Sequence, residues 1–130
     1  MENLRIETTL RFLQSVPVLD VVGEIDIYTT PQFKDAVNSA IEEAGPAIVI
    51  NMANVSYMDS SGFGTLLSAT KRLRPINGAL YLVACNEAIT RMLQITRLNT
   101  IFGVYETEEE AVAAAKDQQA SSQAIVSPSA

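Results

Sequence analysis

Two adjacent serines, Ser60 and Ser61, follow an aspartate where a buried strand is expected to lead into a helix. A hydroxyl at such a turn can act as a nucleophile, accept a phosphoryl group, or cap the helix by accepting a hydrogen bond from a backbone N–H group. The residue types favour Ser60 at the N-cap position. Capping by Ser60 or Ser61 is therefore the simplest structural explanation, and the other two roles need further support.

Two glycines, Gly62 and Gly64, fall within the first turn of the same predicted helix. A glycine inside a helix costs roughly 1 kcal/mol relative to alanine, and capping does not explain this cost. The pair would be explained if another protein must approach the backbone closely, as a kinase active site or a flat partner surface would. The glycines therefore favour a modification or binding role for this segment.

A catalytic role has little support in the residue types. The chain contains no His, so the commonest general base and the commonest metal ligand are missing. Met58 stands where the nucleophile-elbow pattern G-x-S-x-G needs its first glycine, and Lys71 lies about three helical turns from Ser60. The two glycines could hold a phosphate at the helix start, but the P-loop pattern is absent and Asp59 would repel an anion. We expect no catalytic residue, no metal and no cofactor.

A second polar segment, residues 23–31, also lies between a predicted strand and a predicted helix. A solvated acidic turn with ordinary caps would account for it. Loops at the carboxyl ends of neighbouring parallel strands gather at one edge of a sheet. If the two strands are parallel neighbours, Asp26 joins Asp59 and Ser60 in one acidic, partly apolar patch.

The hydrophobic pattern predicts an α/β fold with about five strands and about four helices. The strands are expected at residues 4–9, 16–22, 47–52, 79–84 and 102–105, the second ending at Gly23. The helices are expected from Thr30–Pro31 to Gly45–Pro46, over 61–73, after Asn86, and from the capping box at Thr107 through Ala115. No helix separates the first two strands, so we expect a hairpin there and a mixed, mostly parallel sheet.

Length and charge limit the classes of function. The 130 residues, of which 48% are hydrophobic, suit a single packed domain. A formal net charge of −6 argues against binding nucleic acid or an anionic membrane surface. No signal-peptide pattern and no long apolar run is present, so a cytoplasmic location is expected.

The single cysteine and the final residues carry no sign of chemistry. Cys85 follows an apolar run and is expected to be a buried structural thiol, because one Cys forms neither an internal disulfide nor a Cys-rich zinc site. From Asp117 onward the sequence is rich in Gln, Ala and Ser and lacks periodicity. We therefore predict one domain over residues 1–116 and a disordered tail over 117–130.

The sequence resembles the STAS domain of bacterial anti-sigma factor antagonists over about residues 4–115. The resemblance is carried by Gly-Glu-Ile-Asp at 23–26, by the Met-Asp-Ser-Ser-Gly-Phe-Gly segment at 58–64, and by the downstream segments 78–83 and 89–93 with Leu98. Phe63 departs from the family, which usually has Leu there, but the change keeps an apolar side chain.

The resemblance implies a protein that binds an anti-sigma factor with serine-kinase activity and thereby frees a sigma factor. The kinase would phosphorylate Ser60, with Ser61 as a secondary site, and a PP2C-type phosphatase would reverse the step. The partner surface would comprise Asp26, Tyr28, Asp59, Ser60, Ser61, Gly62 and Phe63. We expect a monomer or weak dimer. The alternative is a non-switching structural STAS subunit of a stress-signalling scaffold or a lipid-transport complex, but the intact acceptor motif favours the antagonist.

Overall fold

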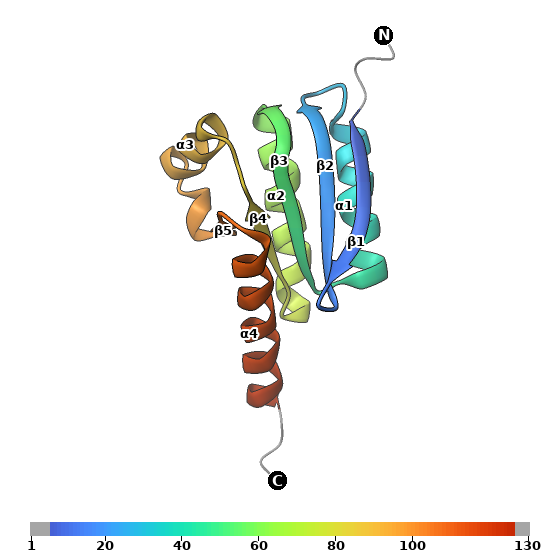
Figure 1. Ribbon diagram of the computed structural model, residues 1–130, viewed down its shortest axis with the longest axis vertical. Coiled ribbons are helices and arrows are strands. Elements are labelled where there is room, and N and C mark those ends of the chain that lie inside the picture. Colours follow the sequence, from blue (N-terminus) through green and yellow to red (C-terminus); the bar gives the residue numbers. More distant parts are fainter. Residues whose placement is uncertain (1–5, 127–130) are drawn as a thin grey trace.

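A single five-stranded sheet forms the centre of the protein in the computed structural model, which describes residues 6–126 (Figure 1). Its strands lie in sequence order: β1 (Glu7–Leu13), β2 (Val16–Ile25), β3 (Ala47–Met58), β4 (Ala79–Val83) and β5 (Gly103–Tyr105). The first pair is antiparallel and the other three pairs are parallel. The predicted hairpin and the mixed, mostly parallel sheet are confirmed.

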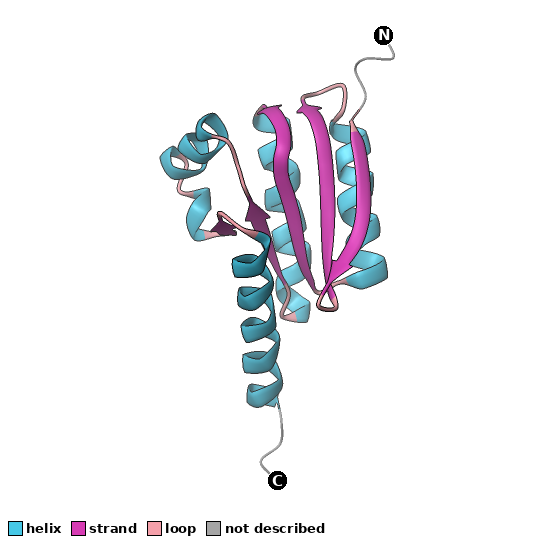
Figure 2. Ribbon diagram, in the orientation of Figure 1, coloured by secondary structure: helices cyan, strands magenta, loops and turns pink. Residues whose placement is uncertain are grey.

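Helices cover both faces of the sheet (Figures 1 and 2). They are α1 (Thr30–Ala44), α2 (Ser60–Leu73), α3 (Glu87–Ile95) and α4 (Glu108–Val126), with short 3-10 turns η2 (Arg74–Ile76) and η3 (Leu98–Thr100). Helices α1 and α2 pack side by side on one face, and α4 packs on the other. No helix in the described part of the chain is long and apolar enough to cross a membrane.

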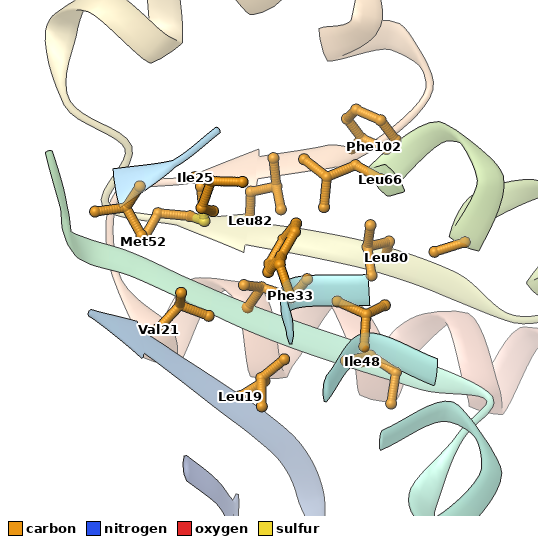
Figure 3. Packing of buried hydrophobic residues seen from close by; sticks show 14 of the residues in the cluster. Leu19, Val21, Ile25, Phe33, Ile48, Met52, Leu66, Leu80, Leu82 and Phe102 are labelled. Carbon is orange, nitrogen blue, oxygen red and sulfur yellow. The ribbon is translucent and has the colours of Figure 1, made fainter. Parts of the chain in front are cut away.

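The core is divided by the sheet into two clusters. Alternate residues of β3 point to opposite faces, so Ile48 and Ile50 pack with α1 and α2, whereas Val49 packs with α4. Figure 3 shows the larger cluster, in which Phe33 and Leu66 from the helices lie among strand residues. Burial on both faces explains why the middle of β3 is an almost unbroken apolar run.

The hairpin turn sets the register of β1. Gln14 and Ser15 both have positive φ angles, 51° and 71°, as a tight hairpin turn requires. Leu13 therefore pairs with Val16, and β1 runs from Glu7 to Leu13 rather than over the predicted residues 4–9. Residues 1–5 lie outside the described part of the chain.

Strands β2 and β3 are longer than the sequence pattern predicted. Gly23 does not end β2; it adopts a φ of 126° where the pairing register with β3 shifts, and the strand continues to Ile25. Strand β3 continues past Met52 because Val55 and Met58 still face the core. The final register pair joins Ile25 to Met58, so both strands end side by side.

Helix α4 also exceeds its prediction. The Thr107 and Glu110 capping box is confirmed, since Glu110 N–H donates to Thr107 Oγ1 and Glu110 Oε1 accepts from Thr107 N–H, both at 3.2 Å. The helix was expected to end near Ala115, but it continues through Val126, so residues 117–126 of the predicted tail are helical. Ala and Gln are good helix formers, and no Gly or Pro lies between Glu108 and Pro128, so helix propensity favours continuation of the helix beyond Ala115. Residues 127–130 lie outside the described part.

Candidate functional site

The loops that follow β2 and β3 meet at one edge of the sheet, because the two strands are parallel neighbours (Figure 1). The Asp59 N–H group donates to the Ile25 carbonyl oxygen at 3.0 Å. The hydroxyl oxygens of Thr30 and Ser61 lie 2.7 Å apart. The starts of α1 and α2 are therefore joined by backbone and side-chain contacts.

Asp59, rather than Ser60, is the N-cap of α2. Its backbone is extended, with φ −97° and ψ −173°, and its Oδ1 accepts hydrogen bonds from Ser61 N–H at 2.9 Å and Ser61 Oγ at 2.5 Å. The Ser61 hydroxyl is the main cause of a lowered Asp59 pKa, so the group is a carboxylate at neutral pH. A negative charge at a helix N-terminus is also favourable. The prediction that Ser60 occupies the cap position is wrong.

Where the two helices begin, three pairs of oxygen atoms lie within hydrogen-bonding distance, and only the hydroxyl protons of Thr30 and Ser61 are available to bridge them. Ser61 Oγ contacts Asp59 Oδ1, Thr30 Oγ1 contacts the Asp26 carbonyl oxygen at 2.6 Å, and the two hydroxyls contact each other. A carboxylate is the strongest acceptor present, so Ser61 donates to Asp59. The Thr30 proton is then shared between Ser61 Oγ and the Asp26 carbonyl. Both sides of the Ser61 hydroxyl are thus occupied.

Ser60 differs from its neighbour in exposure and contacts. It is the first residue of α2 and is exposed, whereas Ser61 is half-buried. No hydrogen bond joins the Ser60 hydroxyl to another side chain or backbone group within residues 6–126. Ser60 therefore presents a solvent-accessible hydroxyl beside a carboxylate.

The two glycines serve different purposes. Gly62 is buried, and a Cβ there would lie 2.4 Å from Met58 Cγ and 2.8 Å from Ile25 Cγ2. Packing inside the protein therefore requires a glycine at position 62. The expectation that a partner's approach explains Gly62 is wrong. A Cβ on Gly64 would meet nothing within 4 Å, so only Gly64 remains without an internal explanation.

Phe63 also belongs to the core rather than the surface. Its side chain is 8% exposed and packs in the larger cluster beneath α2. Its direction follows from helix geometry, because Phe63 and Leu66 lie on the same inward face. The prediction that Phe63 lies on a partner surface is therefore wrong, and its side chain instead supports α2 from the core.

The loop after β2 is organised by Asp26. Its Oδ1 accepts hydrogen bonds from the N–H groups of Tyr28 at 2.9 Å and Thr29 at 3.1 Å. Thr29, not Thr30, occupies the N-cap position of α1, and its hydroxyl donates to the Glu24 carbonyl oxygen at 2.7 Å instead of capping the helix. The loop is thereby held in a turn that leaves Tyr28 71% exposed.

Exposed apolar side chains surround the acidic groups. Ile27 and Tyr28 project from the loop after β2, and Tyr57, 52% exposed, lies opposite Glu24 in the register of β2 and β3. Ile27 and Tyr57 are not among the residues predicted for the partner surface. Ile27 could have been recognised from the sequence, because an isoleucine in an otherwise polar loop indicates an exposed apolar side chain. Both loops and the strand ends beside them thus carry exposed apolar side chains as well as acidic ones.

Within residues 6–126, no cluster of three or more His, Cys, Asp or Glu side chains could hold a metal ion. Buried side-chain nitrogen and oxygen atoms in the described region all have hydrogen-bond partners. The edge described above presents the exposed Ser60 hydroxyl, the carboxylates of Asp26 and Asp59, and the exposed side chains of Ile27 and Tyr28.

Comparisons with known proteins agree with this geometry. The STAS domain model matches residues 7–111. The anti-sigma-B factor antagonist of Staphylococcus aureus (strain NCTC 8325 / PS 47) is 34% identical over 107 residues, which cover 82% of this chain and 97% of that protein. The crystal structure of an anti-sigma factor antagonist from Mycobacterium paratuberculosis has a TM-score of 0.78 at 30% identity, covering 85% of this chain and 94% of that chain.

A further solved structure concerns a modified relative. The phosphorylated form of the Bacillus cell fate determinant SpoIIAA has a TM-score of 0.64 at 26% identity, covering 83% of this chain and 98% of that chain. The match to the domain model spans most of the sequence, and the relatives are covered almost completely. Bacterial anti-sigma factor antagonists are relatives of this chain, which therefore belongs to the STAS-domain family.

Proposed function

We propose that this protein is an anti-sigma factor antagonist that binds an anti-sigma factor with serine-kinase activity, releases the sigma factor, and is switched off by phosphorylation at Ser60. The observation that carries the proposal is the exposed Ser60 hydroxyl at the start of α2, directly after the Asp59 cap. The relatives named as anti-sigma factor antagonists and the phosphorylated form of SpoIIAA support it.

The contacts of the two serines favour Ser60 as the acceptor. A kinase must reach the hydroxyl oxygen and remove its proton during transfer. At Ser61 the proton is committed to Asp59 Oδ1 at 2.5 Å and the oxygen lies 2.7 Å from Thr30 Oγ1. Phosphorylating Ser61 would break both contacts, whereas phosphorylating Ser60 breaks no hydrogen bond with a described residue.

The effect of the phosphate follows from its charge. Phosphorylation adds about −1.5 to −2 charges beside the Asp59 carboxylate, which is already held in its ionised form. The N-terminus of α2 favours negative charge, so the domain keeps its fold. An interface formed around a neutral hydroxyl would instead have to desolvate a dianion. A cost of a few kcal/mol suffices to remove tight binding, since each ~1.4 kcal/mol is tenfold.

The proposed partner surface combines the acidic groups with their apolar neighbours. Asp26 Oδ1 and Asp59 Oδ1 accept backbone hydrogen bonds, and the two carboxylates place negative charge where a cationic side chain of the partner can pair with them. The exposed side chains of Ile27 and Tyr28 can contribute apolar contact area. A PP2C-type phosphatase would restore the binding form. We propose that the protein acts in the cytoplasm as a monomer or weak dimer.

Binding measurements with charge variants test the proposal. The anti-sigma factor kinase should bind the wild type and Ser60→Ala with affinities within about fivefold, and Ser60→Asp at least a hundredfold more weakly. Circular dichroism of Ser60→Asp should stay native, because the residue is exposed. Equal affinity of Ser60→Asp and wild type would refute the charge mechanism.

A further inference from the structure

A groove of about 500 Å³ separates α1 from α2 on the solvent side of these helices. Its floor is formed by the buried residues Val37 and Ala69, and its walls carry exposed Lys34 and Ser68. Ser61 and Thr30 line one end of the groove. The groove therefore begins at the junction beside Ser60 and continues away from it along α2.

The groove has a different charge from the rest of the protein. Lys34 and Arg72 are its ionisable lining residues, and no Asp or Glu lines it, although the chain has a formal net charge of −6. Arg72 is held in place by Asn38 Oδ1 at 2.9 Å and Glu42 Oε2 at 3.1 Å. One lysine and one guanidinium, the latter already paired with Glu42, thus line a wall that is otherwise hydroxyl and amide groups.

Gly64 provides an independent reason to expect close contact here. It lies inside α2, where glycine is unfavourable, and a Cβ at this position would meet nothing within 4 Å. No packing inside the domain requires a glycine. Gly64 lines the groove, so its missing side chain leaves backbone accessible for another chain.

We infer that this groove docks an acidic segment of the anti-sigma factor kinase, extending the interface from Ser60 along α2. The inference rests on the proposed function. Along α2 the lining runs from Ser61 to Arg72, about 16 Å at ~1.5 Å per residue. This length suits about five residues of extended chain rather than a single small anion. Carboxylates of that segment would pair with Lys34 near one end and would share Arg72 with Glu42 near the other.

Three variants test the inference against the same kinase. Lys34→Glu should weaken binding at least tenfold and reduce its dependence on salt concentration, because a close charge pair becomes a repulsion. Gly64→Ala should weaken binding at least threefold while its midpoint of thermal unfolding stays the same or rises. Lys71→Glu is the matched control: it makes the same charge change on an exposed residue of α2 that does not line the groove, and should bind within twofold of wild type.

The outcomes separate this inference from the proposed function. If wild type binds and is labelled at Ser60, but Lys34→Glu and Gly64→Ala bind equally well, the groove inference is wrong and the antagonist role stands. If wild type itself does not bind the kinase, the proposed function fails and the inference fails with it. If Lys34→Glu alters only self-association in sedimentation, the occupant is a second copy of this chain and the inference is overturned.

Discussion

The hydroxyl oxygens of Thr30 and Ser61 lie 2.7 Å apart and connect the first residue of α1 with the second residue of α2. Thr30 Oγ1 also contacts the Asp26 carbonyl oxygen, and Ser61 Oγ donates to Asp59. One chain of polar contacts thus links the loop after β2 to the cap of α2. The geometry around Ser60 depends on this link.

Replacing Thr30 tests the link. Thr30→Val removes the hydroxyl and keeps the side-chain shape, so we expect a loss of about 1 kcal/mol in the free energy of unfolding, measured by urea denaturation. Thr9→Val, at an exposed position on β1, is the control and should change stability by less than about 0.5 kcal/mol. Equal stability of both variants would show that the Thr30 hydroxyl stabilises nothing.

The two glycines of α2 should respond in opposite directions. Gly62→Ala places a Cβ against Met58 and the stiff, branched Ile25, so we expect it to destabilise the protein by about 1 to 3 kcal/mol. Gly64→Ala meets open space and should stabilise by up to about 1 kcal/mol. Thermal and urea unfolding of the pair measures both. Destabilisation by Gly64→Ala would contradict the assignment of that residue to the surface.

A charged network on the α4 side predicts a pH dependence. Glu108 accepts hydrogen bonds from Arg11 and, at 2.5 Å, from Asn51, and the Arg11 contact is the main cause of its lowered pKa. The unfolded chain therefore binds more protons than the folded chain below pH ~5, so stability falls as pH decreases. The stabilisation that Glu108 contributes is fully present above the ordinary glutamate pKa of about 4.3, and it is lost below the lowered pKa that Glu108 has in the folded protein.

Glu108→Gln should isolate that contribution. We expect a loss of about 1 to 3 kcal/mol at pH 7, and a smaller loss as the pH falls below 4, in urea titrations repeated across pH. Glu109→Gln, an exposed neighbour in the same helix turn, should follow the wild-type curve. Parallel curves for wild type and Glu108→Gln would mean that the Arg11 contact is not coupled to stability.

The thiol of Cys85 should react slowly in the folded protein. Burial raises its pKa to about 11, so little thiolate is present at pH 8. Alkylation by iodoacetamide at pH 8 should be at least tenfold slower than in 6 M guanidinium chloride, followed by mass spectrometry. Equal rates in the two conditions would contradict a structural role for this half-buried cysteine.

The sequence pattern predicts the hairpin and the mostly parallel sheet, because these depend on periodicity and on whether a helix separates two strands. It predicts the meeting of the two loops only on the condition that β2 and β3 are parallel neighbours, which they are. Other features depend on which side chains pack against a residue in the folded protein, and the sequence pattern does not show this. Asp59 and Ser60 have similar capping preferences, so residue type could not decide which one caps α2. Gly62 could be explained only once Met58 and Ile25 were seen beside it. A glycine such as Gly23 is consistent both with the end of a strand and with a bulge inside one, so its residue type could not distinguish the two.

The length of α4 could not be predicted for a different reason. Its apolar periodicity ends after Ala115, but helix propensity continues through residues that make no periodic pattern. A prediction that requires both periodicity and propensity therefore ends the helix too early.

Phosphosite mapping tests the central claim most directly. The wild type, Ser60→Ala and Ser61→Ala would each be incubated with the anti-sigma factor kinase and ATP, and phosphate located by mass spectrometry. The account predicts label at Ser60 in wild type and Ser61→Ala, and at least a tenfold loss of label in Ser60→Ala. Label confined to Ser61, or no label on any serine or threonine of the wild type, would contradict it.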